Sequence, residues 1–113
     1  MIQIYHNSRC GKSRQCLAFL ENSGQEFEVI KYLDDVPTFD ELKSIIEKLA
    51  VKPIELVRQK EKIWIEKYKT TTMSDDEIIQ AMISNPILIE RPIVIKGKKA
   101  VIARPLERVT TIM

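Results

Sequence analysis

The sequence is poor in the residues that build metal centres and disulfide frameworks: its 113 residues include one histidine and two cysteines. His6, Cys10 and Cys16 lie at spacings that match no zinc-binding pattern. The same scarcity argues against a small secreted scaffold that depends on disulfides. The fold must therefore be stabilised by a hydrophobic core, which a chain of this length can supply.

Long apolar runs are also missing. No run of hydrophobic residues exceeds five, so no segment can span a membrane, and the first residues lack the apolar core of a signal peptide. These features favour a cytoplasmic protein with free thiols. The net charge is +2, with acids and bases interspersed, which is too weak to indicate nucleic-acid binding. We therefore expect neither a membrane nor a nucleic acid as partner.

Hydrophobic periodicity predicts a strand, a helix and a second strand at the start of the chain. Residues 2–5 and 26–33 alternate apolar and polar side chains, which is typical of strands. Between them, residues 11–22 carry an apolar stripe that includes Cys16 and Leu20, as in an amphipathic helix. This order predicts a βαβ unit.

The middle of the chain, about residues 38–84, predicts a block of helices. Two capping boxes, at Thr38–Glu41 and Ser74–Glu77, each precede a stripe of apolar residues at helical spacing. Pro53 fits the first position of a short helix between them. The block interrupts the strand pattern and so indicates a helical insertion.

The period changes again in the last part of the chain. Residues 93–95 and 100–103 flank a KGKK turn and predict a β-hairpin, and Pro105 can open a last helix. The whole order is β-α-β, a helical insertion, then β-β-α. We therefore predict an α/β protein with a thioredoxin-like fold, forming a single domain over residues 1–113.

Cys10 falls where the first strand ends and the first predicted helix begins. Exposed backbone N–H groups and the positive end of the helix dipole favour a thiolate there, and Arg9, Lys12 and Arg14 place positive charge nearby. Such a loop also suits an oxyanion. These residues fit a nucleophilic cysteine with an anionic substrate, and they fit equally well an ordinary turn cysteine with solvated basic neighbours.

Cys16 is not expected to form a disulfide with Cys10. Six residues of helix separate their α-carbons by roughly 9 Å along the axis, whereas a disulfide tolerates at most about 7 Å. Cys16 also shares an apolar stripe with Leu17 and Leu20, which predicts a buried core thiol. A single reactive sulfur then needs reducing equivalents from outside, from another protein or from a thiol such as glutathione.

His6 precedes Cys10 by four residues, across the predicted turn. As a cation it would favour the thiolate, and as a neutral ring it could relay a proton. A histidine that is simply hydrogen-bonded at a strand end fits the pattern equally well.

Several segments resemble the glutaredoxin-coupled arsenate reductase family. IYHNSRCGKSR is similar to that family's IYHNPxCxxSR loop, NPILIERPIVI to its HPILINRPIVV segment, and ARPLERV to its CRPSEVV segment. YLDDVPTFDEL and ELVRQ also align in order, so the resemblance covers nearly the whole chain. It implies a thioredoxin-like fold with a cis peptide bond at Arg91–Pro92. Ser8 replaces the family's usual proline, which predicts a less rigid loop.

The resemblance also implies which residues act. The expected catalytic residues are Cys10, which is the nucleophile, and His6, which matches the histidine of the family's loop. The residues expected to bind the oxyanion are Arg58, Arg91, Arg104, Ser13 and Arg14. No metal and no bound cofactor are expected. Glutathione is implied as the reducing co-substrate, and glutaredoxin as the partner protein.

The function predicted from these residues is arsenate reduction, started by the Cys10 thiolate and completed by glutathione and glutaredoxin. One alternative is an Spx-type regulator, which shares the fold, senses redox state and binds RNA polymerase. Such regulators typically carry a C-x-x-C pair, whereas this chain has Ser13 at the second cysteine position. The other alternative is a glutathione-dependent oxidoreductase with a different substrate.

Overall fold

The structure is a computed structural model that describes residues 1–113. The chain divides into two compact units. The first consists of Met1–Asp35 and Arg91–Met113, and the second of Val36–Glu90. The predicted helical insertion corresponds to the second unit, while the assignment of one domain to the whole chain stays a prediction.

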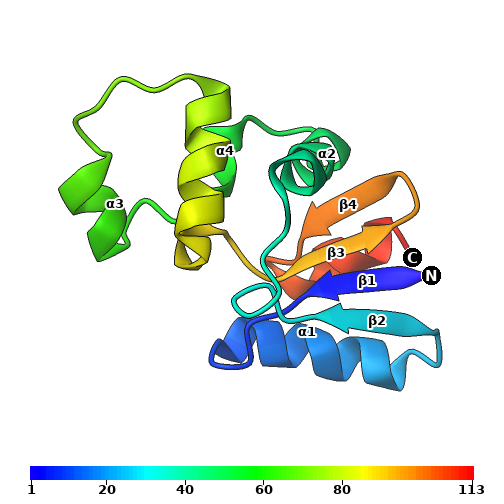
Figure 1. The fold of residues 1–113 in the computed structure, drawn as a ribbon. Helices are drawn as coiled ribbons and strands as arrows, with labels where there is room; N and C mark the ends of the chain where they lie inside the picture. Colours follow the sequence, from blue (N-terminus) through cyan, green and yellow to red (C-terminus); the bar gives the residue numbers. More distant parts are fainter. The chain divides into compact units, whose positions relative to one another are not determined.

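A four-stranded sheet in the order β2-β1-β3-β4 forms the first unit (Figure 1). Its strands are β1 (Ile2–Tyr5), β2 (Phe27–Ile30), β3 (Ile93–Lys96) and β4 (Lys99–Ile102). The pair β1–β2 is parallel, and the pairs β1–β3 and β3–β4 are antiparallel. A parallel pair needs a crossover connection, and here that connection is helix α1 (Gly11–Asn22).

Two helical segments complete the core of the first unit: α1 and the 3₁₀ helix η3 (Leu106–Thr111). The buried core joins strand, helix and hairpin residues, namely Ile2, Ile4, Cys16, Leu20, Val94, Ala103 and Val109. The apolar stripe predicted for residues 11–22 therefore does face the sheet. The last helix opened by Pro105 is present as a 3₁₀ helix.

A two-residue turn of Gly97 and Lys98 joins β3 to β4, since Lys96 pairs with Lys99. Gly97 has φ of 62°, a conformation that glycine adopts without steric penalty and that tight hairpins need. The predicted hairpin is confirmed, with its turn inside the KGKK segment.

The second unit is helical. Its elements are α2 (Phe39–Leu49), η1 (Pro53–Leu56), α3 (Lys62–Lys67), α4 (Asp75–Ser84) and η2 (Pro86–Leu88). Both predicted capping boxes are present, with Thr38 and Ser74 as the N-cap residues of α2 and α4. No helix of the chain has both the length and the apolar character needed to cross a membrane.

The second strand is shorter than predicted. It ends at Ile30, because the backbone N–H groups of Asp34 and Asp35 both donate to the carbonyl of Lys31, at 3.0 and 2.8 Å. The apolar side chains that continue the alternation therefore belong to a turn. The order of the elements nevertheless matches the prediction, and the α/β, thioredoxin-like fold with its helical insertion is confirmed by the β-α-β and β-β-α halves of this sheet.

Candidate active site

Three segments of the first unit meet at the same end of the sheet: the loop after β1, the residues just before β3 and the residues just after β4. Antiparallel pairing aligns Tyr5 at the end of β1 with Ile93, and Ile93 with Ile102 at the end of β4. The loop after β1 therefore emerges beside Arg91, which lies just before β3, and beside Arg104, which follows β4. Strand register thus brings together residues that are far apart in the sequence.

Cys10 is the N-cap residue of α1. Its backbone is extended, with φ of −98° and ψ of 124°, and its carbonyl accepts a hydrogen bond from the N–H of Arg14 at 3.0 Å. Its own N–H donates to the carbonyl of Asn7 at 3.0 Å. The residue is 8% exposed. The thiol therefore lies at the start of the helix, as the sequence predicts.

Two guanidinium groups lie against the sulfur of Cys10. Nη2 of Arg104 is 3.4 Å from Sγ, and Nε of Arg104 donates to the carbonyl oxygen of Arg91 at 2.7 Å. The side chain of Arg91 also donates to the sulfur. The cis peptide bond implied at Arg91–Pro92 is present, and the Arg104–Pro105 bond is cis as well. Both arginines are thus placed to hold an anion beside the thiol.

The pKa of Cys10 lies below its ordinary value. Burial opposes ionisation, but it is outweighed by hydrogen bonds to the sulfur from the backbone N–H groups of Ser13 and Lys12 and by the charge and hydrogen bond of Arg91. The thiolate is the nucleophilic form of cysteine. Cys10 is therefore ionised at a lower pH than a free thiol.

Cys16 behaves in the opposite way. It is fully buried in the core of the first unit, and burial raises the pKa of its thiol to about 11. Both cysteines are free. The prediction of a core thiol at Cys16 is confirmed, so Cys10 is the one thiol whose pKa is lowered, and Cys16 is buried away from it.

Cys10 and Cys16 should differ in their rates of alkylation by iodoacetamide. We expect Cys10 to react with a midpoint below the free-cysteine value of about 8.5. Cys16 should stay unmodified while the chain is folded, because it is buried and its pKa is raised to about 11. Mass spectrometry of samples taken along a pH series gives both rates. A Cys10 midpoint at or above the free value would contradict an activated thiol.

His6 is buried at the end of β1 and is hydrogen-bonded there. Its Nδ1 lies 2.7 Å from Oγ of Ser13, and its backbone N–H donates to the carbonyl of Ile30 at 2.8 Å. Ser13 Oγ in turn accepts from the backbone N–H of Asn7 at 3.0 Å. His6 is thus linked to the residue whose backbone N–H donates to the thiol, rather than to the sulfur itself.

Burial lowers the pKa of His6 below its ordinary value. The charges of Lys31 and Arg14 lower it further, and together these effects outweigh the hydrogen bond with Ser13. The ring is therefore neutral at pH 7. A neutral ring does not stabilise the thiolate by its charge, and the catalytic role of His6 stays a prediction.

The lowered pKa of His6 predicts that folding stability falls as the pH drops through about 6.5. The unfolded chain binds this proton with a pKa of about 6.5, while the folded chain binds it only at lower pH. The unfolded state therefore takes up more protons in this window, and the free energy of unfolding decreases.

Urea unfolding between about pH 5 and 7.5 measures this slope. His6 is the only histidine, so a His6→Gln variant should flatten the curve in that window. An unchanged slope in the variant would show that the titrating group is another residue.

Ser13 and Arg14, predicted to bind substrate, are engaged within the loop itself. The hydroxyl of Ser13 lies between His6 and the N–H of Asn7, and Nη1 of Arg14 donates to the carbonyl of Ser8 at 2.9 Å. In this structure both residues hold the loop around Cys10. Their role in substrate binding stays a prediction.

Asn7, which was not among the residues predicted to act, also shapes the loop. Its Oδ1 accepts a hydrogen bond from the backbone N–H of Arg9 at 3.0 Å, while its carbonyl holds the N–H of Cys10. An asparagine that bonds the backbone two residues on is typical of turns. The sequence signal that could have predicted this role is an asparagine in the predicted turn, three residues before Cys10.

Arg58 belongs to the second unit. Its Nη1 is 3.4 Å from Oε1 of Glu61 and 3.4 Å from the carbonyl of Ile87, and its backbone N–H donates to the carbonyl of Leu88 at 2.7 Å. These contacts fix the arginine within its own unit. Its role in oxyanion binding stays a prediction from the family resemblance.

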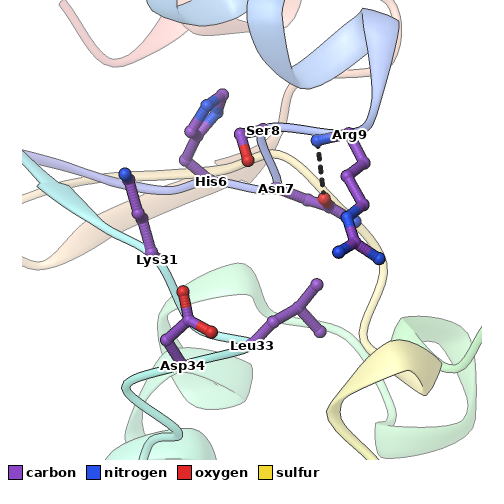
Figure 2. A pocket seen from close by; sticks show the side chains of 7 residues that line it. All are labelled: His6, Asn7, Ser8, Arg9, Lys31, Leu33 and Asp34. Atoms are coloured by element: carbon purple, nitrogen blue, oxygen red, sulfur yellow. Dashed lines mark hydrogen bonds between the residues drawn. The ribbon is translucent and has the colours of Figure 1, made fainter.

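Two hollows open in the first unit near the Cys10 loop. One, of about 270 Å³, is mainly polar and is shown in Figure 2; it is lined by His6, Asn7, Ser8, Arg9, Lys31, Leu33 and Asp34. The other, of about 420 Å³, is lined by Lys12, Gln15, Ala103, Arg104, Pro105, Leu106 and Glu107. No group of three or more His, Cys, Asp or Glu side chains is placed to hold a metal ion.

Comparison with known proteins gives a consistent result. A sequence model of the ArsC family matches residues 5–112. An arsenate reductase from Neisseria meningitidis serogroup A is 39% identical, with 99% of this chain and 97% of the relative covered. The uncharacterised protein YfgD from Escherichia coli is 41% identical, with 99% and 96% covered. The structure of an arsenate reductase from Vibrio cholerae has a TM-score of 0.94 at 41% identity, with 99% and 97% covered.

Proposed function

Since the chain belongs to the ArsC family, we propose that it is an arsenate reductase in which the thiolate of Cys10 attacks the arsenic atom. The observation that carries this proposal is the convergence of Arg91 and Arg104 on a thiol of lowered pKa. Guanidinium groups are planar and permanently charged, and they present forked donors that match the oxygens of an oxyanion.

In the first step the Cys10 thiolate forms a sulfur–arsenic bond and an arsenic–oxygen bond breaks. The departing oxygen takes up protons and leaves as water. Arg91 and Arg104 hold the remaining oxygens, whose negative charge must be stabilised while the bond forms. Until the sulfur–arsenic bond forms, hydrogen bonds from the backbone N–H groups of Lys12 and Ser13 stabilise the thiolate form of Cys10.

Reduction of the arsenic needs an electron pair that this chain cannot supply, because Cys16 is buried with a raised pKa. We propose that glutathione and glutaredoxin supply it. The glutathione thiol displaces a second oxygen as water and forms its own bond to arsenic. Glutaredoxin then attacks the glutathione sulfur, a mixed disulfide forms, and the electron pair of that arsenic–sulfur bond stays on arsenic. Water then releases arsenite and the Cys10 thiol.

The test is arsenate-dependent oxidation of NADPH with glutathione, glutaredoxin and glutathione reductase present. We expect turnover that requires both arsenate and this protein. Replacing these components with thioredoxin and thioredoxin reductase tests the electron donor separately. Turnover only with thioredoxin would contradict the glutathione step, and no turnover with either donor would contradict arsenate reduction.

A further inference from the structure

The larger hollow of the first unit has no role in the chemistry described so far. It measures about 420 Å³ and lies between the first turns of α1 and the segment that follows β4. Lys12 and Gln15 line it from the helix, and Arg104, Leu106 and Glu107 from the other side. It therefore combines charged, polar and apolar side chains within one cavity.

Two lining residues, Lys12 and Arg104, connect this hollow to the reacting sulfur, and the backbone N–H of Lys12 hydrogen-bonds that sulfur. Arg104 lines the hollow, and its Nη2 is 3.4 Å from Sγ of Cys10. A molecule bound there lies against the same guanidinium that contacts the thiol. The hollow of Figure 2 lacks this connection, since Arg104 does not line it.

The charges of the larger hollow suit a ligand that carries both signs. Lys12 and Arg104 contribute positive charge on two walls, and Glu107 contributes one negative charge. Lys12 and Glu107 are exposed, and the ion pairs of the chain join other residues. Their charges are therefore available to a ligand, while Leu106 and Pro105 supply an apolar wall.

We propose that this hollow binds the reducing co-substrate, a peptide thiol with carboxylates and an ammonium group, of which glutathione is the example. This inference rests on the proposed function, which requires an external thiol at Cys10. A carboxylate of the peptide pairs with Lys12 and its ammonium with Glu107. The thiol then lies beside Arg104, where it displaces an oxygen of the Cys10–arsenic adduct as water and forms its own bond to arsenic.

A first test needs no arsenate. S-methylglutathione keeps the charges of glutathione but has no free thiol, so it should protect Cys10 from iodoacetamide by occupying the hollow. We expect Lys12→Ala to weaken this protection by about fivefold in the concentration required, a size typical of one exposed charge contact. The substitution leaves the backbone N–H of residue 12 in place.

Lys98→Ala is the matched control. It removes the same charge from the exposed hairpin turn at the opposite end of the sheet and should leave protection unchanged. Protection is a ratio of rates with and without S-methylglutathione, so any change in the intrinsic reactivity of Cys10 cancels. Absence of protection in the wild type, or equal protection in wild type and Lys12→Ala, would overturn the proposal.

A second test compares thiols by direct measurement of arsenite formation, with glutaredoxin present and each thiol varied in turn, because glutathione reductase couples NADPH oxidation to glutathione alone. The KM for glutathione should rise about fivefold in Lys12→Ala, whereas the KM for 2-mercaptoethanol, which has no charged group to pair, should not change. Glu107→Gln should likewise raise only the KM for glutathione. Equal changes for both thiols would overturn the proposal. A wild type that binds S-methylglutathione in the hollow yet shows no arsenate-dependent turnover would contradict the proposed function and leave the thiol site supported.

Discussion

Cys10→Ser should abolish arsenate-dependent turnover, with a loss of about a thousandfold or more, while the protein stays folded. The hydrogen bonds and the guanidinium charge that lower the pKa of this thiol cannot ionise a hydroxyl to a useful extent. Serine is also a favoured N-cap residue, so α1 should begin at the same position. Steady-state kinetics beside a thermal melt separates lost chemistry from lost structure.

Cys16→Ala is the control for this experiment. It should keep most of the activity, since Cys16 lies in the core and its pKa is raised to about 11. Removing a fully buried sulfur leaves a small cavity and should lower the free energy of unfolding by on the order of 1 kcal/mol. If Cys16→Ala were as inactive as Cys10→Ser, Cys16 would be a resolving thiol and the proposed external reductant would be wrong.

Arg104→Lys should lower kcat/KM for arsenate by at least about tenfold, equivalent to about 1.4 kcal/mol of transition-state stabilisation. One guanidinium makes two directed contacts here: its Nε donates to the carbonyl of Arg91 at 2.7 Å, and its Nη2 lies 3.4 Å from Sγ of Cys10. A lysine keeps the positive charge but lacks the planar pair of N–H donors that makes both contacts. Arg91→Lys should have an effect of similar size, because Arg91 both hydrogen-bonds the sulfur and lowers its pKa.

Arg108→Lys is the matched control for both arginine variants. It makes the same chemical change four residues after Arg104, at an exposed position of η3. Its kinetics and its melting temperature should equal those of the wild type. Should the Arg104→Lys and Arg91→Lys variants melt normally and also reduce arsenate at the wild-type rate, these arginines do not hold the oxyanion.

Local physics explains why much of the fold could be predicted. The capping boxes at Thr38 and Ser74 involve residues only three apart, and both are present in the structure. The apolar stripe of residues 11–22 depends only on helical period, and it correctly placed Cys16 in the core. The second strand was predicted too long because the turn after Ile30 is stabilised by two backbone hydrogen bonds to Lys31, which side-chain alternation does not reveal.

The direction in which the pKa values of Cys10 and His6 shift could be found only from the tertiary structure. The ionisation of Cys10 depends on desolvation set against hydrogen bonds and a charge from Arg91, which is distant in sequence. That of His6 depends on burial and on Lys31, which follows the neighbouring strand β2. The sequence left both questions open because neither balance is a property of the local segment.

By itself, then, the sequence determined the order of the elements, the position of Cys10 at a helix start and the burial of Cys16, since each follows from spacing within one segment. Only the tertiary structure decided that Arg104 meets Cys10, a contact between residues 94 apart in the chain. Antiparallel pairing of β1 with β3 and of β3 with β4 brings the last residues of β1 and of β4 to the same end of the sheet. Register between strands is a long-range property, so no local pattern at either residue could show that they would touch.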